Sequence, residues 1–245
     1  MSEDRAIIYP VKGKTSPDPG RLGVLVSTAA DLNLLCQAVD TDPGASRRLF
    51  TSRLHTVCAD GRQPFSLAGP IIGAPYAVML LETLIAWGAK RFIYLGWCGA
   101  IAPAVNIGDI VLPETAAIDE GTSRHYLQGA SDTSAPSAPL TAEIRRACRG
   151  VGQPLHEGRV WSTDAIFMET RDKVRHFQQQ GVLAVDMEIS ALFTVGAHRG
   201  VEVGGILVVS DELSTLTWRP GFKDERFDKG RVAACEAVKQ ICQRM

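Results

Sequence analysis

The segment PFSLAGPIIGAPYAVMLLETLIAWGAKRFIYLG, residues 64–96, joins two short apolar runs through a longer apolar stretch. Residues 64–69 and 91–96 each have the length and composition of a strand that is buried on both faces. Residues 73–89 have the length of a helix, and Gly88 provides its end. This order predicts a strand–helix–strand unit, from which parallel sheets are built.

The same alternation continues on both sides of this unit. Residues 21–27 form another apolar run, and Thr28 after it is a candidate N-cap for a helix. Further apolar runs predict strands at 109–113, 158–163, 181–185 and 204–210, and helical patterns occur at 141–150, 170–180, 188–199 and 224–245. The sequence therefore predicts an α/β domain over residues 21–245, with a largely parallel sheet that helices cover on both faces.

Two segments lack this alternation. Residues 1–20 contain three prolines and no periodicity, which indicates an arm packed on the surface or across a neighbouring molecule. Residues 128–139 are rich in Ser, Ala and Pro, and they are predicted to form a surface loop because strands continue on both sides. We therefore expect a single domain with an N-terminal arm.

Composition and charge narrow the classes of partner. Among the 245 residues, 45% are hydrophobic and 22% are charged, as in ordinary globular proteins. The formal net charge of −1 provides no general positive field, so neither a nucleic acid nor an anionic membrane is a predicted partner. A small anion would have to be bound by local groups.

Cysteine spacing and the N-terminal sequence indicate the cytoplasm. The six cysteines are widely spaced and form no CxxC pair, which indicates reduced thiols rather than a zinc site or a disulfide framework. The first residues, MSEDR, carry acid where a signal peptide would be only basic. The longest apolar region, residues 76–89, is too short to cross a bilayer. We therefore expect a cytoplasmic protein.

Candidate site residues follow the predicted strands, because ligands of open α/β sheets bind beyond the carboxyl ends of the strands. The segments selected by this rule are residues 27–29, 69–73, 96–99, 163–167, 186–188 and 210–212. Asp211 follows a dry apolar run, where a carboxylic acid can stay protonated and act as a general acid. The alternative is that Asp211 caps the next turn.

Glu188 stands at the start of a predicted helix. Its carboxylate could accept hydrogens from two hydroxyl groups of a sugar at once. The alternative is a favourable negative charge in the first turn of the helix, with Asp186 as the N-cap.

The glycine-bearing run Gly96-Trp97-Cys98-Gly99 has neither the spacing of a dinucleotide-binding loop nor the lysine of a P-loop. A tight turn is the simplest interpretation of it. None of the five histidines has the spacing of a metal-binding motif, so no catalytic metal is predicted.

Three motifs, taken in order, resemble the purine nucleoside and uridine phosphorylase family, whose relatives include nucleosidases that use water. The motifs are KRFIYLGWCGAIAPAVNIGDIVLP at 90–113, VDMEISALF at 185–193 and LVVSDEL at 207–213. The resemblance covers the chain from around residue 21 to its end. The combination of motifs is far more specific than any one of them.

The resemblance implies a three-layer α/β/α sandwich with a mixed, partly barrel-like central sheet. It also implies a homo-oligomer, a dimer-based trimer or hexamer, whose sites lie between subunits. Such an enzyme needs neither a metal nor an organic cofactor, and inorganic phosphate is its co-substrate.

By position, the resemblance implies that Glu188 binds the ribose hydroxyls, with Met187 packing beneath the sugar. Asp211 would protonate or hydrogen-bond the purine at N7, and Ile166 or Phe167 would line the base pocket. The other residues expected to contact the substrate are Asp186, Ser210, Gly99 and Trp97. Breaking an N-glycosidic bond builds positive charge on the sugar and negative charge on the base, which suits acids at both places.

The anion site departs from the family pattern. Family phosphorylases hold phosphate with a Gly-Asp-Pro-x-x-Arg loop, an Arg and a Ser or Thr at the glycine turn, and an Arg lent by a neighbour. Here the first loop reads STAAD at 27–31, and Tyr94 and Trp97 stand where the Arg and the Ser or Thr are expected. Backbone N–H groups at the start of the helix could offset part of the loss. The remaining candidates for anion binding are Thr28, Tyr94 and a lent Arg48.

The expected function is phosphorolysis of the N-ribosyl bond of a purine-type nucleoside. Two alternatives stay open. One is a hydrolase that replaces phosphate by a positioned water, and the other is a non-catalytic nucleoside-binding protein in which Trp97 fills the former anion pocket. The sequence leaves the base, the sugar and the size of the oligomer open.

Overall fold

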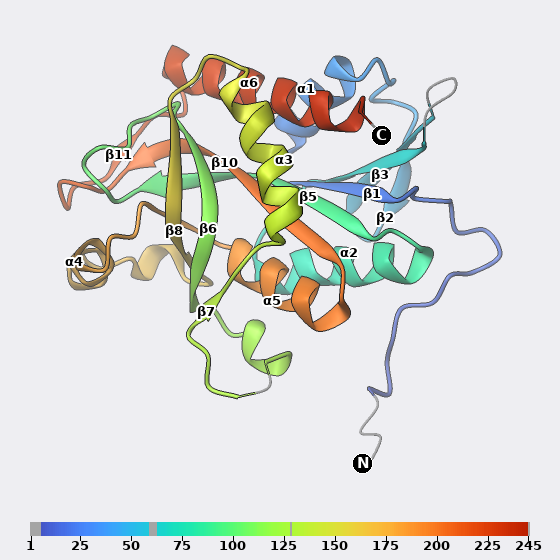
Figure 1. The fold of residues 1–245 in the computed structure, drawn as a ribbon, viewed down its shortest axis with the longest axis horizontal. Coiled ribbons are helices and arrows are strands. Elements are labelled where there is room, and N and C mark those ends of the chain that lie inside the picture. Colours follow the sequence, from blue (N-terminus) through green and yellow to red (C-terminus); the bar gives the residue numbers. More distant parts are fainter. Residues whose placement is uncertain (1–5, 59–62, 128, 245) are drawn as a thin grey trace.

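A mixed sheet runs through the structure, which is a computed structural model that describes residues 6–58, 63–127 and 129–244 (Figure 1). The predicted strand–helix–strand unit consists of β4 (Phe65–Gly69), α2 (Ala74–Trp87) and β5 (Arg91–Ala100). Strand β1 (Leu22–Val26) lies between β4 and β5 and pairs in parallel with both. This parallel centre agrees with the sequence prediction.

One half of the sheet closes on itself. Strand β10 (Glu202–Glu212) pairs with β5 on one side and with β6 (Ile110–Asp119) on the other. The ring continues through β8 (Leu155–Thr163) and β9 (Ala184–Asp186), and β9 pairs again with β5. Parallel and antiparallel pairs both occur in this ring, so the prediction of a mixed, partly barrel-like sheet is confirmed.

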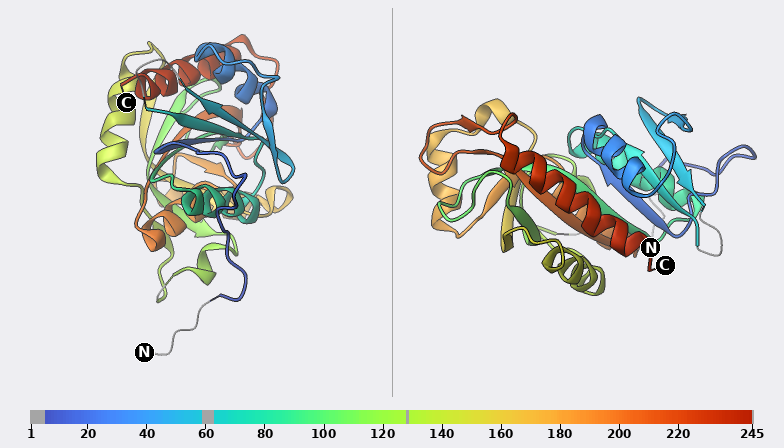
Figure 2. Two further views of the ribbon diagram at one scale, coloured as in Figure 1. Left: turned by 90° about the vertical axis from the view of Figure 1, so that its right-hand side faces the viewer. Right: turned by 90° about the horizontal axis from the view of Figure 1, so that it is seen from above.

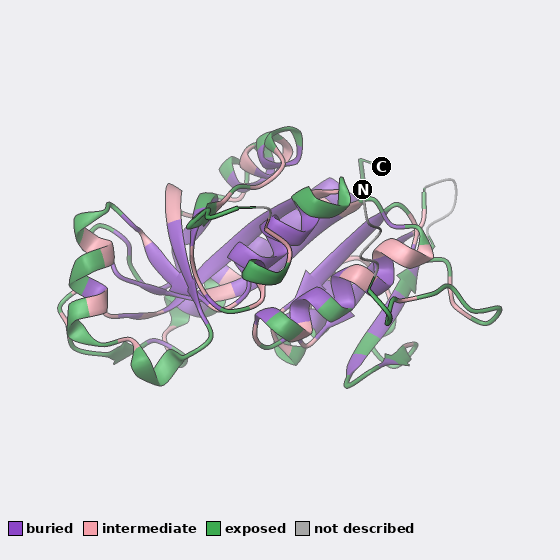
Figure 3. Ribbon diagram, turned by 90° about the horizontal axis from the view of Figure 1, so that it is seen from below, coloured by how far each residue is buried: buried purple, intermediate pink, exposed green. Residues whose placement is uncertain are grey.

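Helices cover the sheet in two groups (Figures 1 and 2). One group consists of α1 (Ala29–Ala38), α3 (Ala138–Arg149) and α6 (Glu225–Cys242), and the other of α2 and α5 (Ile189–Arg199). Alternate side chains of β1 enter different hydrophobic clusters, one beneath each group of helices. Burial on both faces explains why this strand reads as a continuous apolar run, and Figure 3 shows the buried strands between the helices.

Several strands are longer than predicted. Strand β5 continues through Gly96-Trp97-Cys98-Gly99, so the prediction of a tight turn there was wrong. The backbone of this run pairs with β10, and this pairing keeps it extended. Strand β6 extends to Asp119 because it pairs with β8 in the ring, whereas β9 begins only at Ala184.

Other elements were not predicted at all. A hairpin of β2 (Arg47–Leu49) and β3 (Ser52–Val57) extends the sheet antiparallel to β4. In the predicted loop 128–139, β7 (Thr133–Ser134) pairs with β6 and α3 begins at Ala138. Strand β11 (Arg219–Pro220) and the short 3-10 helices η1 (Ser123–His125) and η2 (Ile166–Met168) were not predicted either, whereas α4 (Arg171–Gln179) agrees with the helix predicted at 170–180.

The described part of the predicted arm, residues 6–20, forms no helix or strand. It passes the end of α2, where Lys12 Nζ donates to the Trp87 carbonyl oxygen at 2.9 Å and Trp87 Nε1 donates to the Val11 carbonyl oxygen at 3.2 Å. Residues 1–5 lie outside the described part of the chain. In the part that is described, no helix has both the length and the apolar character needed to cross a membrane.

Candidate active site

A cavity of about 490 Å³ lies at the carboxyl ends of β1 and β4 and along the last residues of β5 and β10, close to where the strand-end rule places ligands. It brings together most of the residues selected from the sequence. These are Thr28, Tyr94, Trp97, Gly99, Ile166, Asp186, Met187, Glu188, Ser210 and Asp211. The acids at 188 and 211 therefore line one cavity, although they are far apart in the sequence.

Two selected residues lie outside this cavity. Phe167 is 98% exposed and is absent from the lining, so Ile166 alone of this pair faces the cavity. Arg48 is exposed on β2, and its Nε donates to the Phe50 carbonyl oxygen at 2.8 Å. Within one chain, Arg48 contributes nothing to the cavity.

A bulge in β10 sets the position of Asp211. The pairing of β10 with β5 shifts register between Val209 and Asp211. Opposite lies Gly99, where a Cβ atom would come within 3.1 Å of Asp211 Oδ2 and 2.7 Å of Leu213 Cδ1. Glycine at this position therefore leaves the space that the carboxyl group occupies.

Both carboxylate oxygens of Asp211 accept hydrogen bonds from the protein. Ser210 Oγ lies 2.7 Å from Oδ1, and Trp218 Nε1 donates to Oδ2 at 2.9 Å. The cap of a following turn, considered as the alternative for Asp211, is not the role seen here. Asp211 is held as a hydrogen-bond acceptor at the edge of the cavity.

Glu188 is buried and directs its carboxylate into the cavity. The backbone N–H of Gly73 donates to Oε1 at 2.6 Å, and the Tyr94 hydroxyl donates to Oε2 at 2.7 Å. Burial raises the pKa of Glu188, and the nearby carboxylate of Asp186 raises it further. Oε2 also accepts from the backbone N–H of Met187 at 3.3 Å, whereas Oε1 has one protein donor and retains a lone pair for a further donor, such as a sugar hydroxyl.

The side chain of Asp186 accepts hydrogen bonds from backbone N–H groups at the start of α5, which is the capping role that the sequence suggested for it. Its Oδ2 accepts from the backbone N–H of Glu188 at 2.9 Å and of Ile189 at 2.8 Å, and its Oδ1 accepts from the Ser162 hydroxyl. These bonds fix the start of α5 and leave the Glu188 side chain to face the cavity.

Tyr94 is buried, and its ring packs closely over Gly96. A Cβ atom at position 96 would lie 2.4 Å from Tyr94 Cε1, so only glycine admits the ring in this position. Tyr94 thereby reaches the carboxylate of Glu188 from the neighbouring strand.

The first turn of α1 contains an acid whose charge is neutralised inside the protein. Asp31 is 2% exposed, and its Oδ1 accepts from Arg231 Nε of α6 at 2.6 Å. Its Oδ2 accepts from the Thr28 hydroxyl at 3.0 Å and from Trp97 Nε1. The Arg231 guanidinium also lies 5.7 Å from the centre of the Trp97 ring. We call Asp31, Arg231 and Trp97 the Asp31 cluster.

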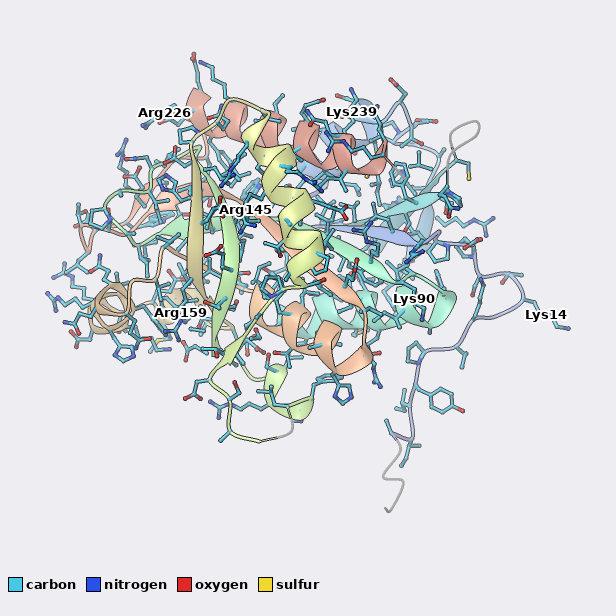
Figure 4. All side chains as sticks on the ribbon, in the orientation of Figure 1. Lys14, Lys90, Arg145, Arg159, Arg226 and Lys239 are labelled. Carbon is cyan, nitrogen blue, oxygen red and sulfur yellow. The ribbon has the colours of Figure 1, made fainter. Side chains whose placement is uncertain are left out.

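Among the described residues that line the cavity there is no Lys or Arg. Figure 4 labels basic side chains on several elements, and none of these lines the cavity: Lys14, Lys90, Arg145, Arg159, Arg226 and Lys239. The groups available to an anion are the hydroxyl of Ser27, which is buried without a hydrogen-bond partner, and the first N–H groups of α1.

Sequence reasoning missed some residues that line the cavity, among them Glu169 and Phe222, whereas Ile72 lies in the selected segment 69–73. Glu169 directly follows η2, close to the selected segment 163–167, so extending that segment by two residues would have included it. Phe222 lies between β11 and α6, and its sequence neighbourhood carries no signal of a site. In the described part of the chain, no three His, Cys, Asp or Glu side chains gather as a metal-binding group.

A profile of the phosphorylase superfamily matches residues 18–245. The chain belongs to this superfamily. Among the relatives of this phosphorylase superfamily member is a guanosine phosphorylase of Halorubrum lacusprofundi, 26% identical over 196 residues, which are 80% of this chain and 76% of the relative. Another is a DeoD-type purine nucleoside phosphorylase of Bacillus cytotoxicus, 32% identical over 151 residues, or 61% of this chain. That alignment spans 64% of the Bacillus protein.

Solved structures of the superfamily share the fold. A uridine phosphorylase from Vibrio fischeri superposes with a TM-score of 0.78 and 25% identity, covering 91% of this chain and 92% of the other. A Plasmodium knowlesi homologue of the P. falciparum purine nucleoside phosphorylase superposes with a TM-score of 0.77 at 18% identity, covering 98% and 97%. The second comparison supports the fold alone.

Proposed function

We propose that this phosphorylase superfamily member cleaves the N-ribosyl bond of a purine nucleoside and transfers the ribosyl group to phosphate. The observation that carries the proposal is that Glu188 and Asp211 line one cavity at the carboxyl ends of the strands. The names of the guanosine and purine nucleoside phosphorylases among its relatives support the same activity.

The two acids suit the charges that develop in this reaction. As the bond between the anomeric carbon and the base breaks, its electron pair moves to the base and the sugar becomes positive. Glu188 accepts hydrogen bonds from the ribose hydroxyls, with Met187 packing against the sugar. Asp211 acts at the base, which Ile166 borders. An oxygen of phosphate then forms the new bond to the anomeric carbon.

A panel of purine and pyrimidine nucleosides, including 5′-modified ones, tests this proposal through release of free base at several phosphate concentrations. Base release that rises with phosphate and yields ribose 1-phosphate is the expected result. Binding of a nucleoside without any release of base would contradict an enzymatic role and favour the nucleoside-binding alternative.

Hydrolysis on the same scaffold is a second candidate function. It is favoured by one observation: the cavity is lined by no Lys or Arg of the described chain, and the Arg231 guanidinium is already paired with Asp31. A dianion needs two or three charge-assisted hydrogen bonds, whereas an attacking water does not. Base release at a rate independent of phosphate, with free ribose as the product, would favour this second candidate.

We also propose that the protein is a cytoplasmic homo-oligomer and that Arg48 enters the cavity of a neighbouring subunit. Apolar side chains of Ile8, Phe50 and Met79 are exposed and line a groove of about 1220 Å³ between residues 6–10 and α2. A second copy of the chain would cover this groove. The free cysteines of the described residues fit a reducing compartment.

Replacing Arg48 by alanine is expected to raise the KM for phosphate by about 10–100-fold, the worth of one charge-assisted hydrogen bond. Steady-state kinetics against phosphate measures the effect, and light scattering gives the mass of the assembly. Arg47→Ala is the matched control, because Arg47 is also exposed on β2. A monomer in solution, or an unchanged KM, would contradict the lent arginine.

Replacing Tyr94 by phenylalanine is expected to raise the KM for the nucleoside by about 10-fold, since Glu188 loses the hydroxyl that orients it. Kinetics against the nucleoside at saturating phosphate measures the change. Tyr76→Phe is the control, because the Tyr76 hydroxyl contacts Ser52 outside the cavity. An unchanged KM would show that Tyr94 does not position Glu188.

A further inference from the structure

Trp218 is an exposed aromatic residue that donates a hydrogen bond to one of the two acids of the cavity. It ends the loop that joins β10 to β11, and it is 60% exposed. Its Nε1 donates to Asp211 Oδ2 at 2.9 Å. The N–H group of an exposed indole can bond to water instead, so folding alone does not require this contact.

The loop that carries Trp218 is fixed at several points. The backbone N–H of Leu213 donates to the Ala100 carbonyl oxygen at 2.8 Å, and an amide side chain of α4 donates to the next carbonyl oxygen of the loop at 2.9 Å. The side chains of Leu213 and Leu216 pack against one of the hydrophobic clusters. Strand β11 then pairs with β10 opposite Asp211. These contacts give the indole a fixed place beside the carboxyl group of Asp211.

The indole determines which oxygen of Asp211 can carry a proton. An indole N–H only donates, so Asp211 Oδ2 has to accept. In a protonated carboxyl group the oxygen without the hydrogen is the better acceptor. The bond from Trp218 therefore favours the form in which Oδ2 is that acceptor and the acidic proton lies on Oδ1.

Ser210 can adapt to both states of Asp211. Its hydroxyl carries one hydrogen, and two acceptors lie within reach: Asp211 Oδ1 at 2.7 Å and the Cys98 carbonyl oxygen at 3.2 Å. While Oδ1 carries a proton, Ser210 can donate to Cys98, and once the proton has left it can donate to Oδ1. Trp218 donates to Oδ2 in both states. Since hydrogen bonds to an ionised acceptor are the stronger ones, this bond strengthens as the proton leaves.

We propose that Trp218 is a positioning residue for Asp211: its N–H directs the acidic proton to Oδ1 and stabilises the carboxylate that forms when the base takes this proton. The inference rests on the proposed cleavage of a nucleoside, with Asp211 acting at the base. It assigns a part in the reaction to a residue for which neither the resemblance nor the motifs provided one.

The proton balance of the step is as follows. The electron pair of the bond between the anomeric carbon and the base moves onto the base, and a ring nitrogen of the base takes the proton from Asp211 Oδ1. Asp211 is left as a carboxylate that accepts from Trp218 and Ser210. The acceptor, hydrogen phosphate or water, bonds to the anomeric carbon and gives up one proton, which restores Asp211. Trp218 keeps its proton throughout.

The first test is Trp218→Phe, which keeps an aromatic ring but has no N–H group. We expect base release from a purine nucleoside in a single turnover to slow by about 10-fold at saturating protein, the lower end of the range for a hydrogen bond to a charged group. The affinity for the nucleoside should stay within about twofold of the wild type. An unchanged rate, or a loss of affinity alone, would overturn the proposal.

Trp87→Phe is the matched control. Trp87 Nε1 also donates a hydrogen bond, to the Val11 carbonyl oxygen at 3.2 Å, but Trp87 does not line the cavity. We expect this variant to cleave the nucleoside at the rate of the wild type. A loss equal to that of Trp218→Phe would show that removing an indole N–H slows the enzyme irrespective of Asp211, and would overturn the proposal.

A double-mutant cycle gives a readout that a merely structural role would not move. If Trp218 acts through Asp211, Trp218→Phe should change the rate by less than about twofold when Asp211 is already replaced by asparagine. The two effects are then far from additive. A further loss of about 10-fold in the Asp211→Asn background would show that Trp218 acts independently of this acid, and would overturn the assignment.

Trp218→Ala separates the N–H group from the packing of the ring. The ring centroids of Trp218 and Phe222 lie 6.3 Å apart, and phenylalanine at position 218 keeps a ring beside Phe222 whereas alanine does not. If the N–H group is the cause, both variants should slow cleavage to within about threefold of each other. A wild-type rate in Trp218→Phe beside a slow Trp218→Ala would assign the effect to packing and overturn the proposal.

Failure of the inference and failure of the proposed function give different results. If the wild type releases base from a nucleoside but Trp218→Phe releases it equally fast, only the assignment of Trp218 is wrong. If the wild type releases base from no nucleoside, the proposed function itself is wrong.

Discussion

Replacing Asp211 by asparagine is expected to lower the turnover of a purine nucleoside by about 10²–10⁴-fold at pH 7.5. Asparagine retains the size of the side chain but offers no carboxyl group to the base at the edge of the cavity. The base then departs without an acid beside it, and the usual contribution of a general acid is lost. Steady-state base release between pH 5 and 8 measures the effect.

The size of the loss decides the role of Asp211. A turnover that stays within about threefold of the wild type would remove Asp211 from the chemistry. Glu212→Gln is the control on the same strand, because the Glu212 side chain accepts from Ile107 N–H and Arg219 rather than facing the cavity.

Replacing Glu188 by alanine is expected to lower kcat/KM by about 10²–10⁴-fold, with KM raised and kcat reduced together. Each ribose hydroxyl that donates to a carboxylate contributes about 1.5–3 kcal/mol, and two such bonds are lost. The contacts strengthen as the sugar becomes positive, so kcat falls as well as affinity. Kinetics with the nucleoside panel measures both constants.

A second variant separates this role from folding. Glu188→Gln keeps an oxygen that can accept from the Gly73 N–H but removes the charge. We expect this variant to melt at a temperature close to that of the wild type and still to lose most of its activity. If Glu188→Ala and Glu188→Gln lose stability in proportion to their loss of activity, Glu188 has only a structural role at the start of α5.

The parts of the fold that follow from local pattern could be predicted from the sequence. The apolar runs of β1, β4 and β10 identify buried strands, because both faces of these strands are covered. The continuation of β5 through Gly96 and Gly99 could not be predicted, because its cause is pairing with β10, which lies more than 100 residues later. Glycines suggest a turn unless a distant strand holds them extended.

The same distinction applies to the site. Glu188 and Asp211 each follow an apolar run, so a rule about strand ends selects them. Phe222 and Arg231 reach the region of the cavity only through tertiary contacts, Phe222 by lining it and Arg231 by pairing with Asp31. No pattern within their own segments indicates a site.

The ion pair between Asp31 and Arg231 joins residues 200 positions apart, and this separation affects how the protein is made. A ribosome adds about 5–20 residues per second, so Arg231 is synthesised roughly 10–40 s after Asp31. During that interval the nascent chain contains Asp31 but not the guanidinium that neutralises it, so the carboxylate stays in water. The start of α1 and the Trp97 ring bonded to Asp31 reach their final packing only after α6 has been made and has docked, which makes this side of the cavity one of the latest parts of the molecule to mature during translation.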